Sequence, residues 1–108
     1  MVKSLSNDWY VQYAIGGVEA LEFLDTESFD IVVTDLNMPE INGVKLLKYI
    51  QKYHSHIVRI VFSSSLTRES IKSIAPFTHR FIAKPCGVKK LAQAIENSLF
   101  IYRELDNK

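Results

Sequence analysis

Short runs of apolar and β-branched residues alternate along the chain with segments whose apolar positions recur every three or four residues. A continuous β-branched run is typical of a strand buried on both faces, whereas the wider spacing places apolar side chains on one face of a helix. The pattern predicts four strands, at residues 9–15, 30–35, 58–62 and 80–83. It predicts a helix after each strand, with apolar faces at residues 18–24, 44–50, 71–74 and 88–102.

Turn-forming and capping residues separate these elements. Gly16 and Gly17 end the first strand, and the turn formers of residues 36–43 end the second. Thr67 is expected to cap the third helix, because its hydroxyl can satisfy a free amide group there, and Pro76 is expected to end that helix. A strand–helix order repeated four times implies an α/β domain with a mainly parallel sheet and helices on both faces.

Three of the predicted strands end in polar residues, namely Asp35, Ser63 and Lys84. Ligand chemistry in parallel sheets takes place at the carboxyl ends of the strands, so these side chains are expected to converge at one edge. There a carboxylate can attack phosphorus and form an aspartyl phosphate, a hydroxyl can donate to a phosphoryl oxygen, and a lysine supplies positive charge. A Mg²⁺ ion would normally neutralise the charge of such a transfer.

These residues and their spacing resemble the response regulator receiver domain of two-component signalling, over about residues 9–103. Residues 30–39 and Gly43 resemble the family's third strand and the loop that carries its phosphoacceptor. The Lys84-Pro85 pair, with Phe81 three residues before the lysine, matches further family positions. The resemblance implies a flavodoxin-like, doubly wound parallel sheet, of which strands two to five are present in this chain.

The resemblance also implies a role for each residue. Asp35 would accept the phosphoryl group, and it would ligate Mg²⁺ together with the backbone carbonyl of Asn37. Ser63 would be the switch hydroxyl, Lys84 would contact the phosphate and Phe81 would be the aromatic switch. The phosphoryl donor would be a sensor histidine kinase or a phosphotransfer protein, and the switch would alter a protein-interaction face. Such a domain modifies itself and is not expected to be an enzyme.

The start of the chain departs from the family pattern. Receiver domains begin with a strand that ends in a pair of acidic residues, whereas residues 1–8 match only the end of the helix that follows, and Asp8 is their one acid. We therefore expect residues 1–108 to be a single receiver domain, incomplete at its N-terminus and without an output domain, that binds Mg²⁺ weakly or not at all. An open sheet edge favours association, so a homodimer or a domain-swapped assembly is expected.

Composition and charge narrow the function classes. A chain of 108 residues with 47% apolar and 23% charged residues is ordinary for one globular domain. Eight acidic residues and one lysine give residues 1–40 a charge of −7, which leaves +8 for the remainder. The basic residues are spread out rather than clustered with aromatic side chains, which argues against nucleic-acid binding. No signal peptide or membrane-length apolar run is present, so we expect a cytoplasmic location.

Two other functions fit parts of the pattern. A degenerate receiver would act as a phosphorylation-independent interaction or dimerisation module, which the lack of an acidic pair favours and the phosphoacceptor set opposes. A hydrolase with an aspartate nucleophile would place a second aspartate where Asn37 stands. His54 and His56 would not share a helix face, and the lone Cys86 is expected to be a small packing residue, so these residues predict no site.

Overall fold

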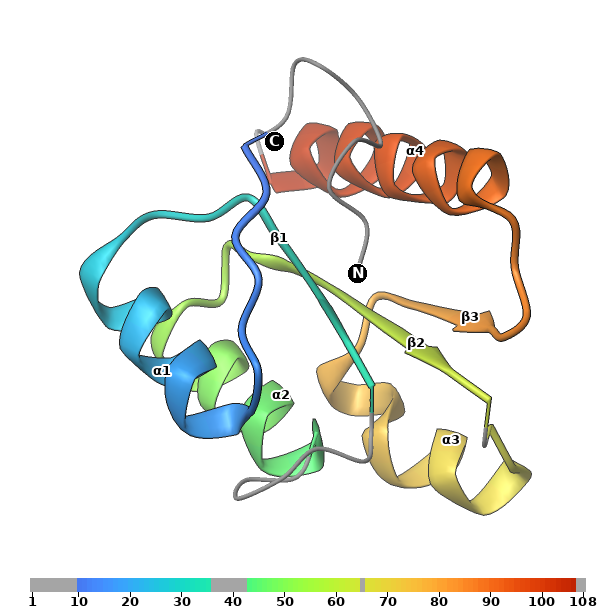
Figure 1. The fold of residues 1–108 in the computed structure, drawn as a ribbon, viewed down its shortest axis with the longest axis horizontal. Coiled ribbons are helices and arrows are strands. Elements are labelled where there is room, and N and C mark those ends of the chain that lie inside the picture. The colour runs from blue at the N-terminus through green and yellow to red at the C-terminus, as the bar shows by residue number, and fades with distance from the viewer. Residues whose placement is uncertain (1–9, 36–42, 65, 107–108) are drawn as a thin grey trace.

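The computed structural model describes residues 10–35, 43–64 and 66–106, with only the backbone of residues 103–106. Its sheet has three parallel strands in the order β1 (Ile31–Thr34), β2 (Val58–Ser63) and β3 (Arg80–Ala83) (Figure 1). The helices are α1 (Gly17–Thr26), α2 (Gly43–Tyr53), α3 (Arg68–Ile74), the short 3-10 helix η1 (Ala75–Phe77) and α4 (Val88–Asp106). The predicted α/β class with a parallel sheet is confirmed.

Helices cover the two faces of the sheet unequally. Among the helices of the described residues, Figure 1 shows α4 on one face of the sheet and the others on the opposite face. Successive residues of β2 alternate between the two layers, as the pleat of a strand requires. Ile60 lies in an apolar cluster with Leu91 of α4, whereas Val61 lies in a cluster with Leu47 of α2 and Ile74 of α3. β2 is therefore buried on both faces.

The α1 and α2 helices are held together by a third apolar cluster. Leu24 of α1 is buried against Leu46 and Ile50 of α2 and against Ile57, and Val32 of β1 packs against the same cluster. The α1 helix is thus fixed to the layer that covers one face of β1. None of the helices in the described ranges has the length and apolar character needed to cross a bilayer.

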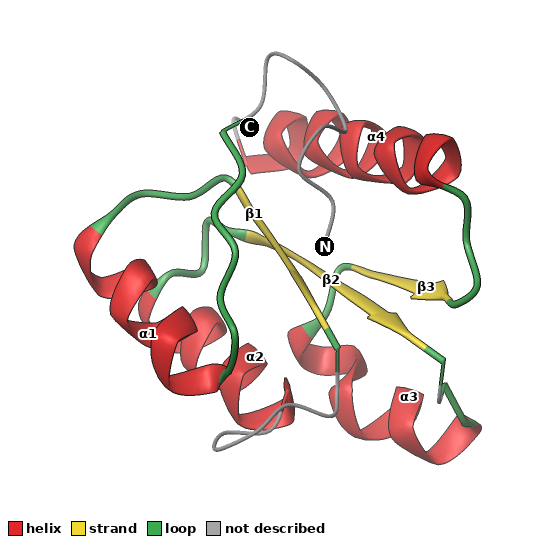
Figure 2. Ribbon diagram, in the orientation of Figure 1, coloured by secondary structure: helices red, strands yellow, loops and turns green. Residues whose placement is uncertain are grey.

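The strand predicted at residues 9–15 is wrong for residues 10–15, the part of it that the structure describes. These residues form a loop (Figure 2), and the sheet of the described residues has three strands instead of four. Aromatic and β-branched residues favour a strand only where a pleated neighbour gives them a surface to pack on. No such neighbour pairs with this segment among the described residues, and Tyr10, Tyr13 and Ile15 are exposed. Residues 1–9 lie outside the description.

The helix boundaries follow the local chemistry closely. The Thr67 cap is confirmed, because its Oγ1 accepts a hydrogen bond from the Ser70 N–H at 3.1 Å while Ser70 Oγ accepts one from the Thr67 N–H at 2.9 Å. The α3 helix ends at Ile74, and the chain continues through Pro76 as η1. Val88 was expected on the apolar face of the last helix, but its side chain is exposed because the packing of α4 on β2 starts at Leu91.

Candidate functional site

The carboxyl edge of the sheet brings together residues that the sequence places far apart. Asp35 follows β1, Ser63 is the last residue of β2, and Lys84 follows β3. Lys84 Nζ lies 3.1 Å from Asp35 Oδ2, so the two side chains form a hydrogen-bonded ion pair. The Lys84 N–H also donates to the carbonyl oxygen of Ser63 at 3.0 Å. A carboxylate, a cation and a hydroxyl-bearing residue therefore meet at one edge.

The register of the strands explains why the ion pair can form. Thr34 pairs with Val61 and Ser63 pairs with Ala83, so β2 ends level with β3 and two residues beyond β1. The Lys84 side chain can therefore pass the end of the middle strand, where its Nζ lies 5.2 Å from the centroid of the Phe62 ring. The ion pair thus joins the two outer strands across the end of β2.

The charged side chains of the site are accessible to solvent, whereas its serine is buried. The side chains of Asp35 and Lys84 are 31% and 43% exposed, so an incoming group can reach the carboxylate. An ion pair exposed to this extent adds little to stability. Ser63 is 1% exposed and lies below this surface at the end of β2.

Phe81 lies on β3 in the layer that faces α2 and α3. It is half-buried and packs against the cluster formed by Leu47, Val61 and Ile74. In the β2–β3 register it stands opposite Val61, two residues before the end of β2 at Ser63. In this structure its ring is thus part of the apolar packing of the sheet.

Among the described residues, the carboxyl edge supplies one carboxylate towards a magnesium site. Mg²⁺ takes a near-octahedral set of oxygen ligands, usually one or two carboxylates completed by water and substrate phosphate. The edge supplies the carboxylate of Asp35, which already pairs with Lys84, and the second expected ligand, Asn37, lies outside the described residues. Within the described ranges, no group of three or more His, Cys, Asp or Glu residues could hold a metal ion.

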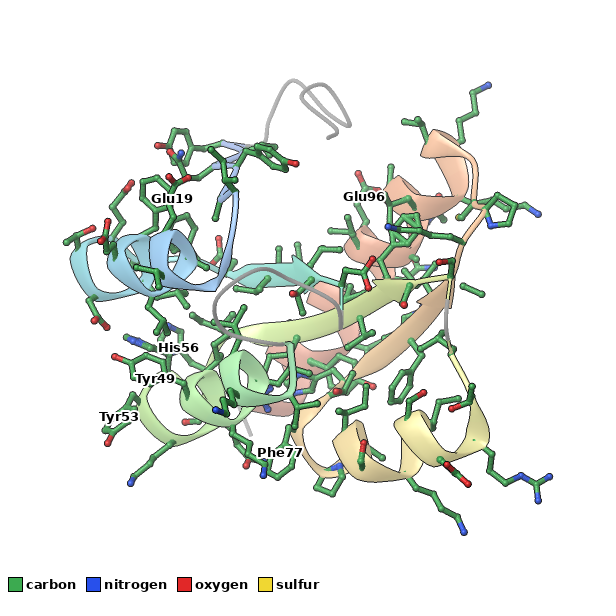
Figure 3. The ribbon with its side chains drawn as sticks, turned by 60° about the horizontal axis from the view of Figure 1, so that its bottom comes forward. Glu19, Tyr49, Tyr53, His56, Phe77 and Glu96 are labelled. Atoms are coloured by element: carbon green, nitrogen blue, oxygen red, sulfur yellow. The ribbon has the colours of Figure 1, made fainter. Side chains whose placement is uncertain are left out.

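A second polar cluster lies at the opposite, amino edge of the sheet. The Tyr49 hydroxyl donates to Asp25 Oδ1 at 2.7 Å, and this hydrogen bond to the carboxylate raises the pKa of Tyr49 above its ordinary value of 10.0. His54 Nε2 lies 3.5 Å from the same oxygen. An open pocket of about 300 Å³ beside them is lined by residues from the end of α1 and by His56. Figure 3 shows Tyr49, Tyr53 and His56 together near the end of α2, where the cluster joins α1 to α2.

Sequence reasoning missed a polar network around Arg59, which is 6% exposed in the middle strand. Its Nε donates to the Phe77 carbonyl oxygen at 2.9 Å, and its backbone N–H donates to His79 Nδ1 at 2.9 Å. The Tyr102 hydroxyl of α4 donates to the His79 carbonyl oxygen at 2.9 Å. His79 therefore links β2 to α4. A charged residue inside an otherwise apolar strand indicates such a network, because a buried charge needs hydrogen-bond partners.

Comparison with known proteins agrees with this architecture. The family model described as response regulator receiver domain matches residues 2–96. The sensor kinase CckA of Brucella abortus is 34% identical over 103 residues, which are 91% of this chain and 11% of that protein. The chemotaxis protein CheY of Bacillus subtilis is 32% identical over 91 residues, 82% of this chain and 75% of CheY. This chain therefore spans a small part of the kinase and most of CheY.

The fold similarity extends to solved structures. The CheY-like receiver domain protein of Methanospirillum hungatei superposes with a TM-score of 0.85 at 20% sequence identity. The superposition covers 90% of this chain and 78% of that chain. At this level of identity the likeness establishes the fold alone. The chemistry has to be inferred from the residues at the sheet edge.

Proposed function

Because the chain belongs to the response regulator receiver domain family, we propose that it accepts a phosphoryl group on Asp35 from a sensor histidine kinase or a phosphotransfer protein. The observation that supports this most strongly is the 3.1 Å contact between Lys84 Nζ and Asp35 Oδ2 at the carboxyl edge of the parallel sheet. This is the edge at which such sheets bind their ligands. It offers a reachable carboxylate with a cation beside it.

The proposed reaction is a transfer between two side chains. A carboxylate oxygen of Asp35 forms a bond to phosphorus while the bond between phosphorus and the donor's imidazole nitrogen breaks. The imidazole leaves with the electron pair. It leaves as neutral imidazole if its other nitrogen is protonated, and otherwise it takes a proton from solvent. The acyl phosphate carries a charge of about −1.5 to −2 in place of the single negative charge of the carboxylate. The Lys84 ammonium is placed to compensate part of this increase.

Ser63 and Phe81 are proposed to carry the signal away from Asp35. A hydrogen bond from the Ser63 hydroxyl to a phosphoryl oxygen would pull on the last residue of β2. Phe81 packs next to Val61 of the same strand, so such a shift would change the packing space of its ring. The face built by α3, β3 and α4 would then differ between the two states, which is what a two-state interaction surface requires.

The location and the association of the domain are also proposals. We place the domain in the cytoplasm, where the free thiol of Cys86 stays reduced, and we treat it as a single signalling unit that also associates with a second copy. A degenerate receiver that works without phosphorylation is the competing function. The described residues favour phosphorylation over that alternative because the ion pair is in place, even though they supply a single carboxylate.

Incubation with acetyl phosphate in magnesium buffer, followed by intact-mass spectrometry, tests the proposal. We expect the native chain to gain the mass of one phosphoryl group and Asp35→Asn to gain none. Asp30→Asn is the matched control, because Asp30 is exposed at the other end of the same strand and should leave the modification unchanged. An unmodified native chain would favour the degenerate receiver, and a modified Asp35→Asn would place the phosphoryl group elsewhere.

The cation is tested separately with Lys84→Met. A hydrogen bond to a charged group contributes about 1.5–3 kcal/mol, so its loss should slow the modification on the order of tenfold or more. Lys89→Met removes an exposed lysine from the first turn of α4 and should leave the rate within about twofold of the native chain. Equal rates for the two variants would remove Lys84 from the proposed mechanism.

A further inference from the structure

In the sheet formed by the described residues, the strand β1 lies at an edge. It pairs with β2 on one side, and within the described residues no strand pairs with its other side. An edge strand presents backbone amide and carbonyl groups that can pair with another chain. Natural edge strands are usually protected by charged residues or proline, and β1 consists of Ile31, Val32, Val33 and Thr34.

One face of this edge strand is also uncovered. Ile31 packs at the margin of the cluster under α4, and Val33 lies on the same face because side chains alternate along a strand. The side chain of Val33 is nevertheless 40% exposed, and the buried residues of that cluster come from β2 and α4. The edge therefore combines open backbone groups with an exposed apolar side chain.

The segment 10–15 has complementary properties. It contains no charged residue and no proline, and its aromatic and β-branched residues favour a strand. Tyr13 is 53% and Ile15 is 76% exposed. Among the described residues no backbone hydrogen bond joins this segment to a strand, although the Ile15 N–H donates to Glu19 Oε1 at 3.2 Å. It has the composition of a strand without having a neighbour.

We propose that these two features complete each other between two copies of the chain. The segment 10–15 of one copy pairs with the open edge of β1 in the other, and a two-fold axis repeats the contact in reverse. A closed, self-complementary dimer of this kind pairs the outer edge of β1 in both copies and forms no open filament. Pairing of the segment with β1 of the same copy is disfavoured. The segment leads through Gly16 directly into α1, and α1 is held against α2 on one face of the sheet by Leu24.

The first test is the mass of the purified full-length chain in solution without a phosphoryl donor. Light scattering on a sizing column at about 50 μM should give twice the 12.4 kDa of one chain. Val33→Lys and Ile15→Lys should each give the mass of a single chain, because both place a charge on the paired surface. Val88→Lys is the control, since Val88 is 57% exposed on α4 and should leave the dimer intact. A native monomer, or dimeric Val33→Lys, overturns the proposal.

The second test locates the contact and does not depend on the lysine variants. In a Cys86→Ser background, Val33→Cys and Tyr13→Cys are made on separate chains that carry different tags, and the mixture is treated with a short bismaleimide. We expect a cross-linked product that carries both tags. No such product, or cross-linking that occurs only when both cysteines are on one chain, would show that the segment does not pair with the edge of a second copy. Neither test depends on the phosphorylation of Asp35, so the two proposals can fail independently.

Discussion

The strands β1 and β2 are both rich in β-branched residues, yet they have very different surroundings. In β2, Ile60 and Val61 are fully buried, because helices cover both faces and a strand lies on each side. In β1, Val33 is 40% exposed, although it stands opposite Ile60 in the register. The difference shows that burial is decided by neighbouring elements more than by the residue types of the strand itself.

The two regions also differ in how they can be used. The covered region around β2 and β3 supplies the rigid frame that holds Lys84 against Asp35. On the outer side of β1, the proposed dimer contact would use the exposed Val33. Substitutions in one region, with matched substitutions in the other, therefore test this difference.

The largest effect is expected from Arg59 in the covered region. Arg59→Met removes the donor to the Phe77 carbonyl oxygen and to the loop before β2, which leaves buried acceptors without partners. We expect the free energy of unfolding to fall by about 2–4 kcal/mol in urea titrations followed by circular dichroism. Arg80→Met, on an exposed arginine of the neighbouring strand, should change it by less than about 0.5 kcal/mol. Similar losses in both variants would contradict a structural role specific to Arg59.

A smaller effect compares the same substitution in both strands. Val61→Ala deletes two methyl groups from a fully buried position and should cost about 2–3 kcal/mol, because the cavity adds to the lost burial. Val33→Ala, at a position that is 40% exposed, should cost less than about 1 kcal/mol when unfolding is measured on the monomer at low concentration. Equal costs would show that the β1 edge is as well covered as the middle strand.

The smallest effect concerns the amino edge. Asp25→Asn replaces the carboxylate that raises the pKa of Tyr49, so that pKa should fall towards 10.0, as measured by the ultraviolet titration difference against Tyr49→Phe. Because the folded-state pKa is raised, the hydrogen bond stabilises the native chain below pH 10 and the contribution is lost as pH rises through the pKa of Tyr49. An unchanged titration would mean that Asp25 does not accept this hydrogen bond in solution.

Much of the site could be predicted from the sequence because it depends on topology. Once three strands are parallel, their carboxyl ends share an edge, so Asp35, Ser63 and Lys84 have to lie near one another. The capping of α3 was equally predictable, since the Thr67 and Ser70 bonds span three residues. The capping follows from a local sequence pattern, and the shared edge follows from the parallel order of the strands.

The rest depended on contacts that a local pattern cannot contain. The segment 10–15 has strand-like residues but lacks a neighbouring strand, and propensity alone cannot supply one. Arg59 is buried in β2 because the carbonyl oxygens of a loop and of η1 surround its side chain. The link between Tyr49 and Asp25 joins residues 24 positions apart on different helices. Each case required the three-dimensional arrangement of elements that are distant in the sequence.

The central claim is that Asp35 is the phosphoacceptor at the carboxyl edge of the sheet, and mapping the modified residue tests it most directly. After incubation with acetyl phosphate, borohydride reduces an acyl phosphate to an alcohol, which converts the modified aspartate to homoserine, and peptide mass spectrometry then locates it. We predict homoserine at position 35 in the native chain and, in Lys84→Met at the same early time point, about a tenth of that amount or less. Homoserine at another aspartate, a reduced glutamate (5-hydroxynorvaline), or no reduced residue would contradict the account.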